Sequence, residues 1–152
     1  MSKTAIFTMG LPAAGKSSVL ALRNVQHVID PDAIKASHPD YDPKNPAALH
    51  VWSKAEAEVE FACALQASYR FALDGTGTNV DVLIANMRRA KVAGFTVHLL
   101  HVAVSLETAL ERNAKRERTV PEQVLREKAE TIWVAFELAA KEADEVEVVW
   151  NE

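Results

Sequence analysis

The chain has 152 residues, of which 49% are hydrophobic and 25% charged, as expected for one globular domain spanning residues 1–152. Its net charge of −4 argues against sequence-independent wrapping of nucleic acid, although a local basic site can still bind an anion. No run of 18 apolar residues and no signal-like segment exist, so we expect no membrane association and a cytoplasmic location. The single cysteine, Cys63, has apolar neighbours that predict a buried structural thiol.

Apolar runs and helical patterns alternate along the chain. The strands are predicted at 4–9, 26–30, 69–73, 95–104 and 145–150. The helices are predicted at 17–23, in one turn after Asp32, at 47–68, at 80–93 with Gly94 as its stop, at 106–115 and at 121–143.

This alternation predicts an α/β fold, in which a five-stranded parallel sheet is covered by helices on both faces. Such sheets bind ligands beyond the carboxyl ends of their strands. Three polar clusters follow predicted strands: Gly10–Ser18, Asp30–Lys35 and Asp74–Thr78. We therefore expect them to meet in one site.

The first cluster has the pattern G-x-x-x-x-G-K-[ST], met by Gly10, Gly15, Lys16 and Ser17 between a strand and a helix. Backbone N–H groups of such a loop surround the phosphates of ATP or GTP, the lysine adds a positive charge, and the serine hydroxyl can bind Mg²⁺. The remaining nucleotide-binding candidates in the loop are Ala13, Ala14 and Ser18. A chance Gly-rich turn would explain neither Lys16 nor Ser17.

The second cluster, Asp30-Pro-Asp32-Ala-Ile-Lys35, supplies a candidate general base for accepting a hydroxyl proton. Asp32 and Lys35 share one helical face, so Lys35 could hold an anionic group of the acceptor. Asp30 is a candidate substrate contact. Either aspartate could instead cap the helix that follows.

The third cluster begins at Asp74, which closes the strand Phe71-Ala-Leu and precedes Gly-Thr-Gly. Asp74 is a candidate for Mg²⁺ or acceptor binding, and Thr76 supplies a hydroxyl in the same place. A turn set by Asp74 before two glycines is the alternative.

Three arginines gather after the fourth predicted strand. Arg112 and Arg116 are four residues apart on one predicted helix face, and Arg118 follows. Guanidinium groups bind phosphoryl oxygens bidentately, so the run predicts a short lid that clamps the nucleotide. The alternative is a solvated helix paired with nearby glutamates.

Together the motifs G-x-P-x-x-G-K-S, D-x-D-x-I-K, D-G-T-G and R-N-A-x-R-x-R-x-V-P resemble those of polynucleotide kinases and zeta-toxin-like kinases. The resemblance implies a P-loop fold similar to adenylate kinase and an ATP-dependent kinase that uses Mg²⁺. It also implies Asp32 as general base, Lys35 as the contact to an acceptor phosphate, Lys16 and Ser17 for ATP and Mg²⁺, and Arg112 and Arg116 as the phosphate clamp.

Two departures leave the acceptor open. Ala13-Ala14 replaces a more usual Gly-Ser or Gly-Ala, and Lys35 stands where arginine is general in these families. The leading hypothesis is phosphorylation of a nucleic-acid or nucleotide-like hydroxyl, such as a 5′-hydroxyl end or 5-hydroxymethyluracil, as in a viral kinase acting in host cytoplasm. The alternatives are a nucleotide sugar or small metabolite, and a nucleotide-binding switch or ATPase. No protein partner is predicted.

Overall fold

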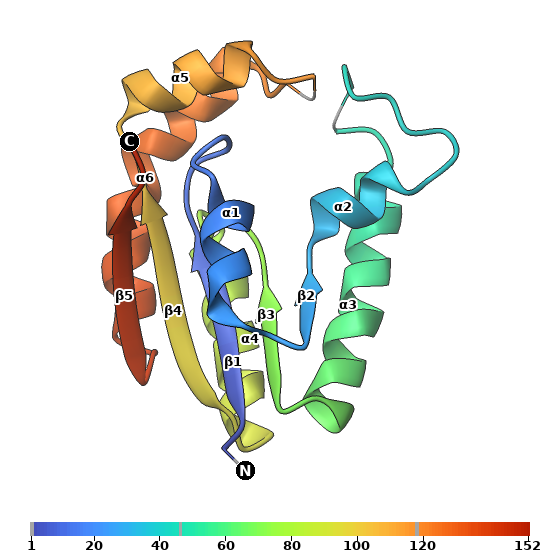
Figure 1. Ribbon diagram of the computed structural model, residues 1–152, viewed down its shortest axis with the longest axis vertical. Helices are drawn as coiled ribbons and strands as arrows, with labels where there is room; N and C mark the ends of the chain where they lie inside the picture. Colours follow the sequence, from blue (N-terminus) through green and yellow to red (C-terminus); the bar gives the residue numbers. More distant parts are fainter. Residues whose placement is uncertain (1, 46, 118) are drawn as a thin grey trace.

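A computed structural model describes residues 2–45, 47–117 and 119–152, which form one parallel sheet with helices around it (Figure 1). The strands are β1 Thr4–Met9, β2 His27–Ile29, β3 Arg70–Leu73, β4 Thr96–Ala103 and β5 Glu145–Trp150. Their order across the sheet is β2-β3-β1-β4-β5, and all neighbours are parallel. The predicted α/β class and five-stranded parallel sheet are confirmed.

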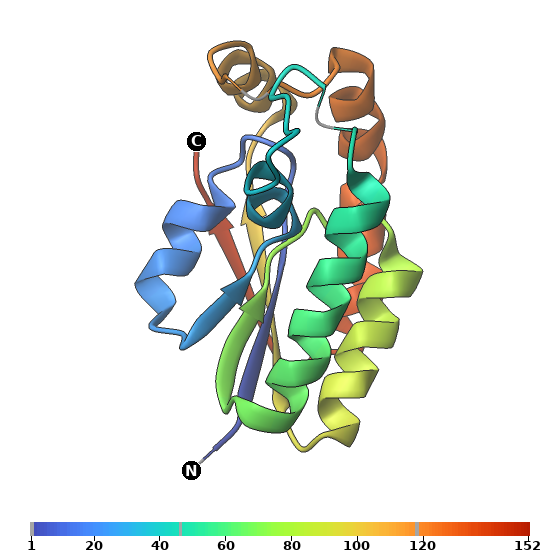
Figure 2. The same cartoon turned by 90° about the vertical axis from the view of Figure 1, so that its right-hand side faces the viewer.

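The helices are α1 Lys16–Leu20, α2 Pro31–Ala36, α3 His50–Ala67, α4 Val80–Val92, α5 Leu106–Ala114 and α6 Glu122–Ala140. Helices α3, α4 and α6 cover one face of the sheet, and α1 lies on the other (Figure 2). Helix α5 lies beyond the carboxyl ends of the strands, on the same side as the turn between β1 and α1 (Figure 1). This end of the sheet is where the three polar clusters were expected to meet.

The strand β1 lies at the centre of the sheet and is almost fully buried. Its Phe7 makes an edge contact with Phe61 of α3, which also contacts Phe71 of β3. Phe71 in turn contacts Phe95 just before β4. Because both faces of β1 are covered, its sequence is a continuous apolar run rather than an alternating one.

Three local predictions differ from the structure. The helix after the Gly-rich loop becomes a 3-10 turn at Ala21–Arg23. The long third helix begins at His50 rather than Ala47, because Leu49 has a left-handed backbone with φ 67°. Cys63 is exposed, because the buried residues of α3 are Ser53, Ala57, Phe61 and Ala64 and leave it on the outer side. The predicted stop at Gly94 is confirmed, with φ +92° directly after the cap of α4.

One buried histidine lies on β4. His101 is 1% exposed and packs against Trp133 and Phe136 of α6, with ring centroids 4.5 and 5.0 Å away. Among the described residues its Nδ1 has no hydrogen-bond partner. Burial lowers the pKa of His101 to about 4, and the positive charge of Lys16 acts in the same direction.

We therefore expect the free energy of unfolding to decrease as the pH is lowered from about 6.5 to about 4. In this window the unfolded chain binds a proton at His101 that the folded chain does not bind. The loss attributable to this group reaches up to about 3 kcal/mol and levels off below the folded pKa. Urea unfolding at several pH values measures it, with His101→Phe as reference. The wild type should lose more stability than the variant across this window, and parallel pH profiles would contradict the assignment.

Candidate active site

The loop from Gly10 to Ser17 joins β1 to α1 at the centre of the sheet edge (Figure 1). A side chain at Gly10 would collide with the carbonyl oxygen of Val102, and the Gly10 N–H donates to the Thr76 carbonyl at 3.0 Å. Gly15 has φ 87°, and Ala13 has φ 69°, a left-handed conformation that costs a non-glycine residue about 1 kcal/mol. The loop thus has the turned backbone that directs successive N–H groups inward.

Lys16 folds back over this loop. Its Nζ donates to the carbonyls of Gly10 at 3.1 Å and Leu11 at 3.2 Å. Burial lowers the pKa of Lys16, while the carboxylates of Asp74 and Asp32 favour its charged form. A positive side chain therefore lies within the loop, beside two acidic groups.

Asp74 follows β3 and is 7% exposed. Its Oδ1 accepts a hydrogen bond from Thr8 Oγ1 at 2.7 Å, and its Oδ2 lies 3.5 Å from Ser17 Oγ. The Asp74 N–H donates to the carbonyl of Ile29, which fixes the end of β3 against β2. This carboxylate and the Ser17 hydroxyl are thus held side by side.

Asp30 caps α2, since its Oδ1 accepts from the N–H groups of Asp32 at 2.9 Å and Ala33 at 3.3 Å. Burial, followed by the negative charge of Asp74, raises the pKa of Asp30. Asp32 is exposed at the start of the same helix. Capping by Asp30 fixes the backbone from which Asp32 projects.

The residues predicted to form an arginine lid lie on α5 and in the turn after it. Helix α5 ends at Ala114, so Arg116 lies past the helix rather than on the predicted face with Arg112. The Arg112 guanidinium nevertheless approaches the Ala14 carbonyl at 3.4 Å. Arg118 lies outside the described residues.

These groups line a cavity of about 400 Å³ at the carboxyl end of the sheet. It brings together most of the predicted site: Ala13, Gly15, Lys16, Ser17, Ser18, Asp30, Asp32, Asp74, Thr76, Arg112 and Arg116. Gly10 and Ala14 are buried in the same loop. Lys35 is 6% exposed and lines neither this cavity nor the next, so its contact with an acceptor stays a prediction.

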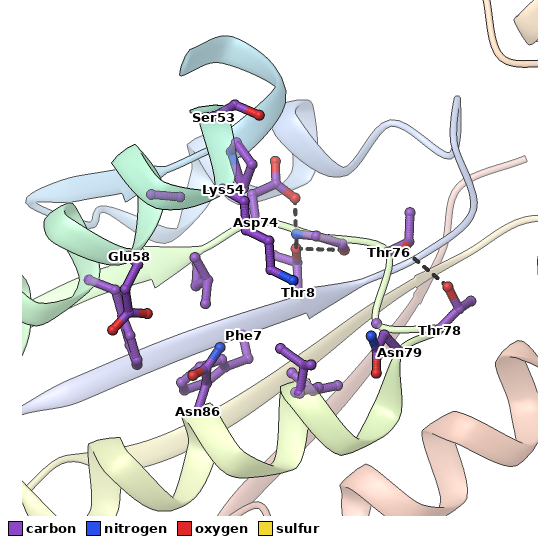
Figure 3. A pocket seen from close by; sticks show the side chains of 18 of the residues that line it. Phe7, Thr8, Ser53, Lys54, Glu58, Asp74, Thr76, Thr78, Asn79 and Asn86 are labelled. Atoms are coloured by element: carbon purple, nitrogen blue, oxygen red, sulfur yellow. Dashed lines mark hydrogen bonds between the residues drawn. The ribbon is translucent and has the colours of Figure 1, made fainter. Parts of the chain in front are cut away.

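A second, larger cavity of about 910 Å³ lies between α3 and α4 and shares Asp74, Gly75 and Thr76 with the first (Figure 3). Its floor includes Phe7 of β1 and Phe61 of α3. The Thr76 and Thr78 hydroxyls, 3.3 Å apart, belong to the same loop. The two cavities therefore meet at the loop after β3.

Three polar residues that hold the site were not predicted. Thr8 bonds Asp74, and Asn113 of α5 bonds both backbone groups of Val120, which ties the lid turn to its helix. Asn151 donates from Nδ2 to the Ala14 carbonyl at 2.8 Å, while its own N–H donates to Ala103. Thr8 and Asn151 have partners distant in sequence, so no local pattern indicates them, whereas Asn113 bonds a residue seven positions away.

Asn151→Ala should weaken ATP binding by up to about 10-fold, because the Ala14 carbonyl would lose the shorter of its two side-chain hydrogen bonds and the loop would be held less firmly. Calorimetric titration measures the dissociation constant. Asn151→Asp is the matched variant, since it keeps the side-chain shape and the backbone bond to Ala103 but removes the donor. Wild-type affinity in both variants would show that the bond does not position the loop.

Among the described residues, no helix is long and apolar enough to cross a membrane. No described group of three or more His, Cys, Asp or Glu side chains could form a metal cage. Ser17 and Asp74 still fit Mg²⁺, because this ion is commonly held by one or two carboxylates together with phosphate oxygens and water.

Comparison with known proteins gives one family match, to the model described as Zeta toxin, over residues 1–151. No curated protein sequence matches the chain significantly. Among solved structures, the PezAT toxin–antitoxin system of Streptococcus pneumoniae aligns with a TM-score of 0.73 and 16% identity, covering 98% of this chain and 68% of that one.

Two further structures share the fold. The AvrRxo1-ORF1:ORF2 structure with ATP has a TM-score of 0.70 and 18% identity, covering 92% of this chain and 50% of that one. The Pnkp1/Rnl/Hen1 RNA repair complex has a TM-score of 0.70 and 11% identity, covering 90% of this chain and 46% of that one. Because these neighbours come from complexes or a toxin–antitoxin system, they give no support to the prediction of no protein partner. They give none to a viral origin either.

Proposed function

Because the chain belongs to the zeta toxin family, whose P-loop fold is that of ATP-dependent kinases, we propose that it transfers the γ-phosphate of ATP to a hydroxyl of a nucleotide-like or other small acceptor. The observation that carries this proposal is the junction of the two cavities at Asp74, Gly75 and Thr76. One cavity has the residues of a phosphate site, and the other has room for a second substrate.

ATP would occupy the smaller cavity. Its β- and γ-phosphates would accept hydrogen bonds from the loop N–H groups and from Lys16, which would exchange its bonds to the Gly10 and Leu11 carbonyls for phosphate oxygens. Bound Mg²⁺ would be held by Ser17 and Asp74 and would neutralise phosphate charge. Arg112 and Arg116 would bind the phosphates from the lid.

In the reaction the acceptor oxygen forms a bond to the γ-phosphorus while the bond to the oxygen bridging the β- and γ-phosphates breaks, releasing ADP. We assign Asp32 as the base that takes the hydroxyl proton, since it is exposed on the wall of the phosphate cavity. Asp30 would support it by capping the helix from which it projects. The arginines would stabilise charge on the transferred group.

A hydroxyl of a nucleic acid, such as a 5′ end or 5-hydroxymethyluracil, is the second candidate acceptor. The fold likeness to the Pnkp1 complex and the arginine run from Arg112 to Val120 favour it. The volume of the larger cavity instead favours a small molecule, because about 300–1,000 Å³ is the usual range of small-ligand sites. We place the reaction in the cytoplasm, given a single cysteine and ATP as donor.

Transfer of label from γ-labelled ATP separates the two acceptors. The enzyme is incubated with a 5′-hydroxyl oligonucleotide, a hydroxymethyluracil-containing DNA, and a mixture of nucleotide sugars and sugar phosphates. The proposal predicts label on a member of the small-molecule mixture. Label confined to either nucleic acid would establish the second candidate instead.

A further inference from the structure

Two lysines in the lining of the larger cavity, Lys54 and Lys128, have no part in the phosphate chemistry described above. We propose that Lys54 and Lys128 bind the negative group of the acceptor, which makes the substrate a small anionic alcohol with an apolar body. This inference rests on the proposed function, because it names the class of molecule that the kinase would phosphorylate.

The shape of the cavity fits such a molecule. Part of its lining is formed by the apolar side chains of Phe7, Phe61, Leu73 and Leu83, which favour a ring or hydrocarbon portion over a fully hydrated one. Polar groups lie at one side of it, where Figure 3 shows the Thr76 and Thr78 hydroxyls at the loop after β3. An acceptor would therefore lie with its apolar portion inward and its polar groups toward the loop.

The acidic side chains of this lining already have partners. Glu58 of α3 pairs with Arg89 of α4 at 2.7 Å, and the Arg89 guanidinium also lies 4.7 Å from the centre of the Phe61 ring. The Asp74 carboxylate is bonded to Thr8 and faces Ser17. Glu58 is therefore paired with an arginine, and the charge of Asp74 acts on Lys16 and would help to hold Mg²⁺, so neither carboxylate is committed to Lys54 or Lys128.

The two lysines, in contrast to Glu58, are not in ion pairs among the described residues. In the part of the chain that the structure describes, neither Lys54 nor Lys128 has a carboxylate within 4.0 Å. Lys54 reaches from α3 into the cavity (Figure 3), and Lys128 of α6 donates to Thr78 Oγ1 at 3.1 Å. Two ammonium groups from different helices thus face one cavity, an arrangement complementary to a carboxylate or a phosphate.

The hydroxyl to be phosphorylated would lie close to the negative group, because Lys128 bonds Thr78 and the Thr78 hydroxyl is 3.3 Å from that of Thr76, where the cavities meet. The cavities meet at Gly75 and Thr76, and the Thr76 carbonyl is bonded to Gly10 of the phosphate loop. A molecule anchored by its charge at the lysines can therefore present a hydroxyl toward the γ-phosphate. Anchoring of this kind aligns the reacting groups and lowers the entropic part of the barrier.

The test compares matched charged and uncharged alcohols as acceptors of label from γ-labelled ATP: 4-(hydroxymethyl)benzoate against its amide, ribose 5-phosphate against ribose, and glycerol 3-phosphate against glycerol. The charged member of at least one pair should have a kcat/KM about 10-fold or more above its partner, since a hydrogen bond to a charged group is worth about 1.5–3 kcal/mol. This preference should fall to within about 3-fold in Lys54→Gln/Lys128→Gln. The exposed Lys141→Gln is the control and should keep the preference.

Binding of the same compounds to the enzyme with a non-hydrolysable ATP analogue, followed by NMR titration, gives a readout independent of transfer. Charge-selective binding that depends on Lys54 and Lys128, without labelled product, would support the anion site and count against the kinase proposal. Transfer that is equal for charged and uncharged partners, or a preference that survives in the double variant, would overturn the anion site while leaving the kinase intact. The absence of charge-selective binding by any pair would also overturn the site.

Discussion

Asp32→Asn should lower kcat by between about 100-fold and 10,000-fold and leave the ATP dissociation constant within a few fold of wild type. The variant keeps the size and polarity of the side chain but cannot take a proton from the acceptor hydroxyl. Asp32 lies on the wall of the phosphate cavity and is exposed, so the substitution makes no cavity in the core. Steady-state rates of phosphate transfer and calorimetric titration with ATP measure the two quantities.

Asp30→Asn is the matched comparison for this variant. Asp30 lines the same cavity but bonds the N–H groups of Asp32 and Ala33 as a helix cap. We expect this second variant to lower stability by about 1 kcal/mol or less and to reduce kcat far less than Asp32→Asn does. If Asp32→Asn retains full activity, or if Asp30→Asn has the larger effect on kcat, the base is misassigned.

Lys16→Ala should raise the ATP dissociation constant by roughly 10-fold to 100-fold, the effect expected from losing one charge-assisted hydrogen bond to phosphate. In the folded chain the Lys16 ammonium is held by two loop carbonyls, and burial disfavours its charge. Its removal should therefore not unfold the protein. Calorimetry measures ATP affinity, and thermal unfolding without nucleotide checks the fold.

Lys141→Ala serves as the control for loss of positive charge, because Lys141 is exposed at the end of α6, outside both cavities. It should bind ATP as the wild type does. An unchanged dissociation constant in Lys16→Ala would contradict the assignment of the Gly10–Ser17 loop as the phosphate site.

The features predicted from sequence are those encoded in neighbouring residues. The apolar run at Thr4–Met9 followed by Gly10 was sufficient to place β1 and the loop, because strand and turn signals are local. The convergence of the three clusters followed from parallel topology alone, since all strands of such a sheet end on the same edge. Both predictions depended on order along the chain and on no particular long-range contact.

The features that sequence did not reveal depend on contacts between distant residues. Asn151 reaches Ala14 across 137 positions, and Thr8 reaches Asp74 across 66. The burial of Lys35 and the exposure of Cys63 depend on how α2 and α3 pack, which helical spacing leaves undetermined. Lys54 and Lys128 were missed for the same reason, because only the folded chain brings α3 and α6 to one cavity.

The left-handed Ala13 links a sequence departure to the folded backbone. The loop needs φ 69° at this position, a conformation that glycine adopts more readily than alanine. Ala13 adopts this conformation despite its side chain, which adds local strain to the loop. The alanine pair is therefore no argument against phosphate binding by this loop.

The most direct test of the central claim is the fate of the γ-phosphate when labelled ATP is incubated with the enzyme and a cell-derived pool of small metabolites. If the two cavities form a kinase site, label should appear in an acid-stable organic phosphate, at a rate that depends on the added pool and is lost in Asp32→Asn. Release of inorganic phosphate alone, at a rate unaffected by any acceptor, would instead identify an ATPase and contradict the account.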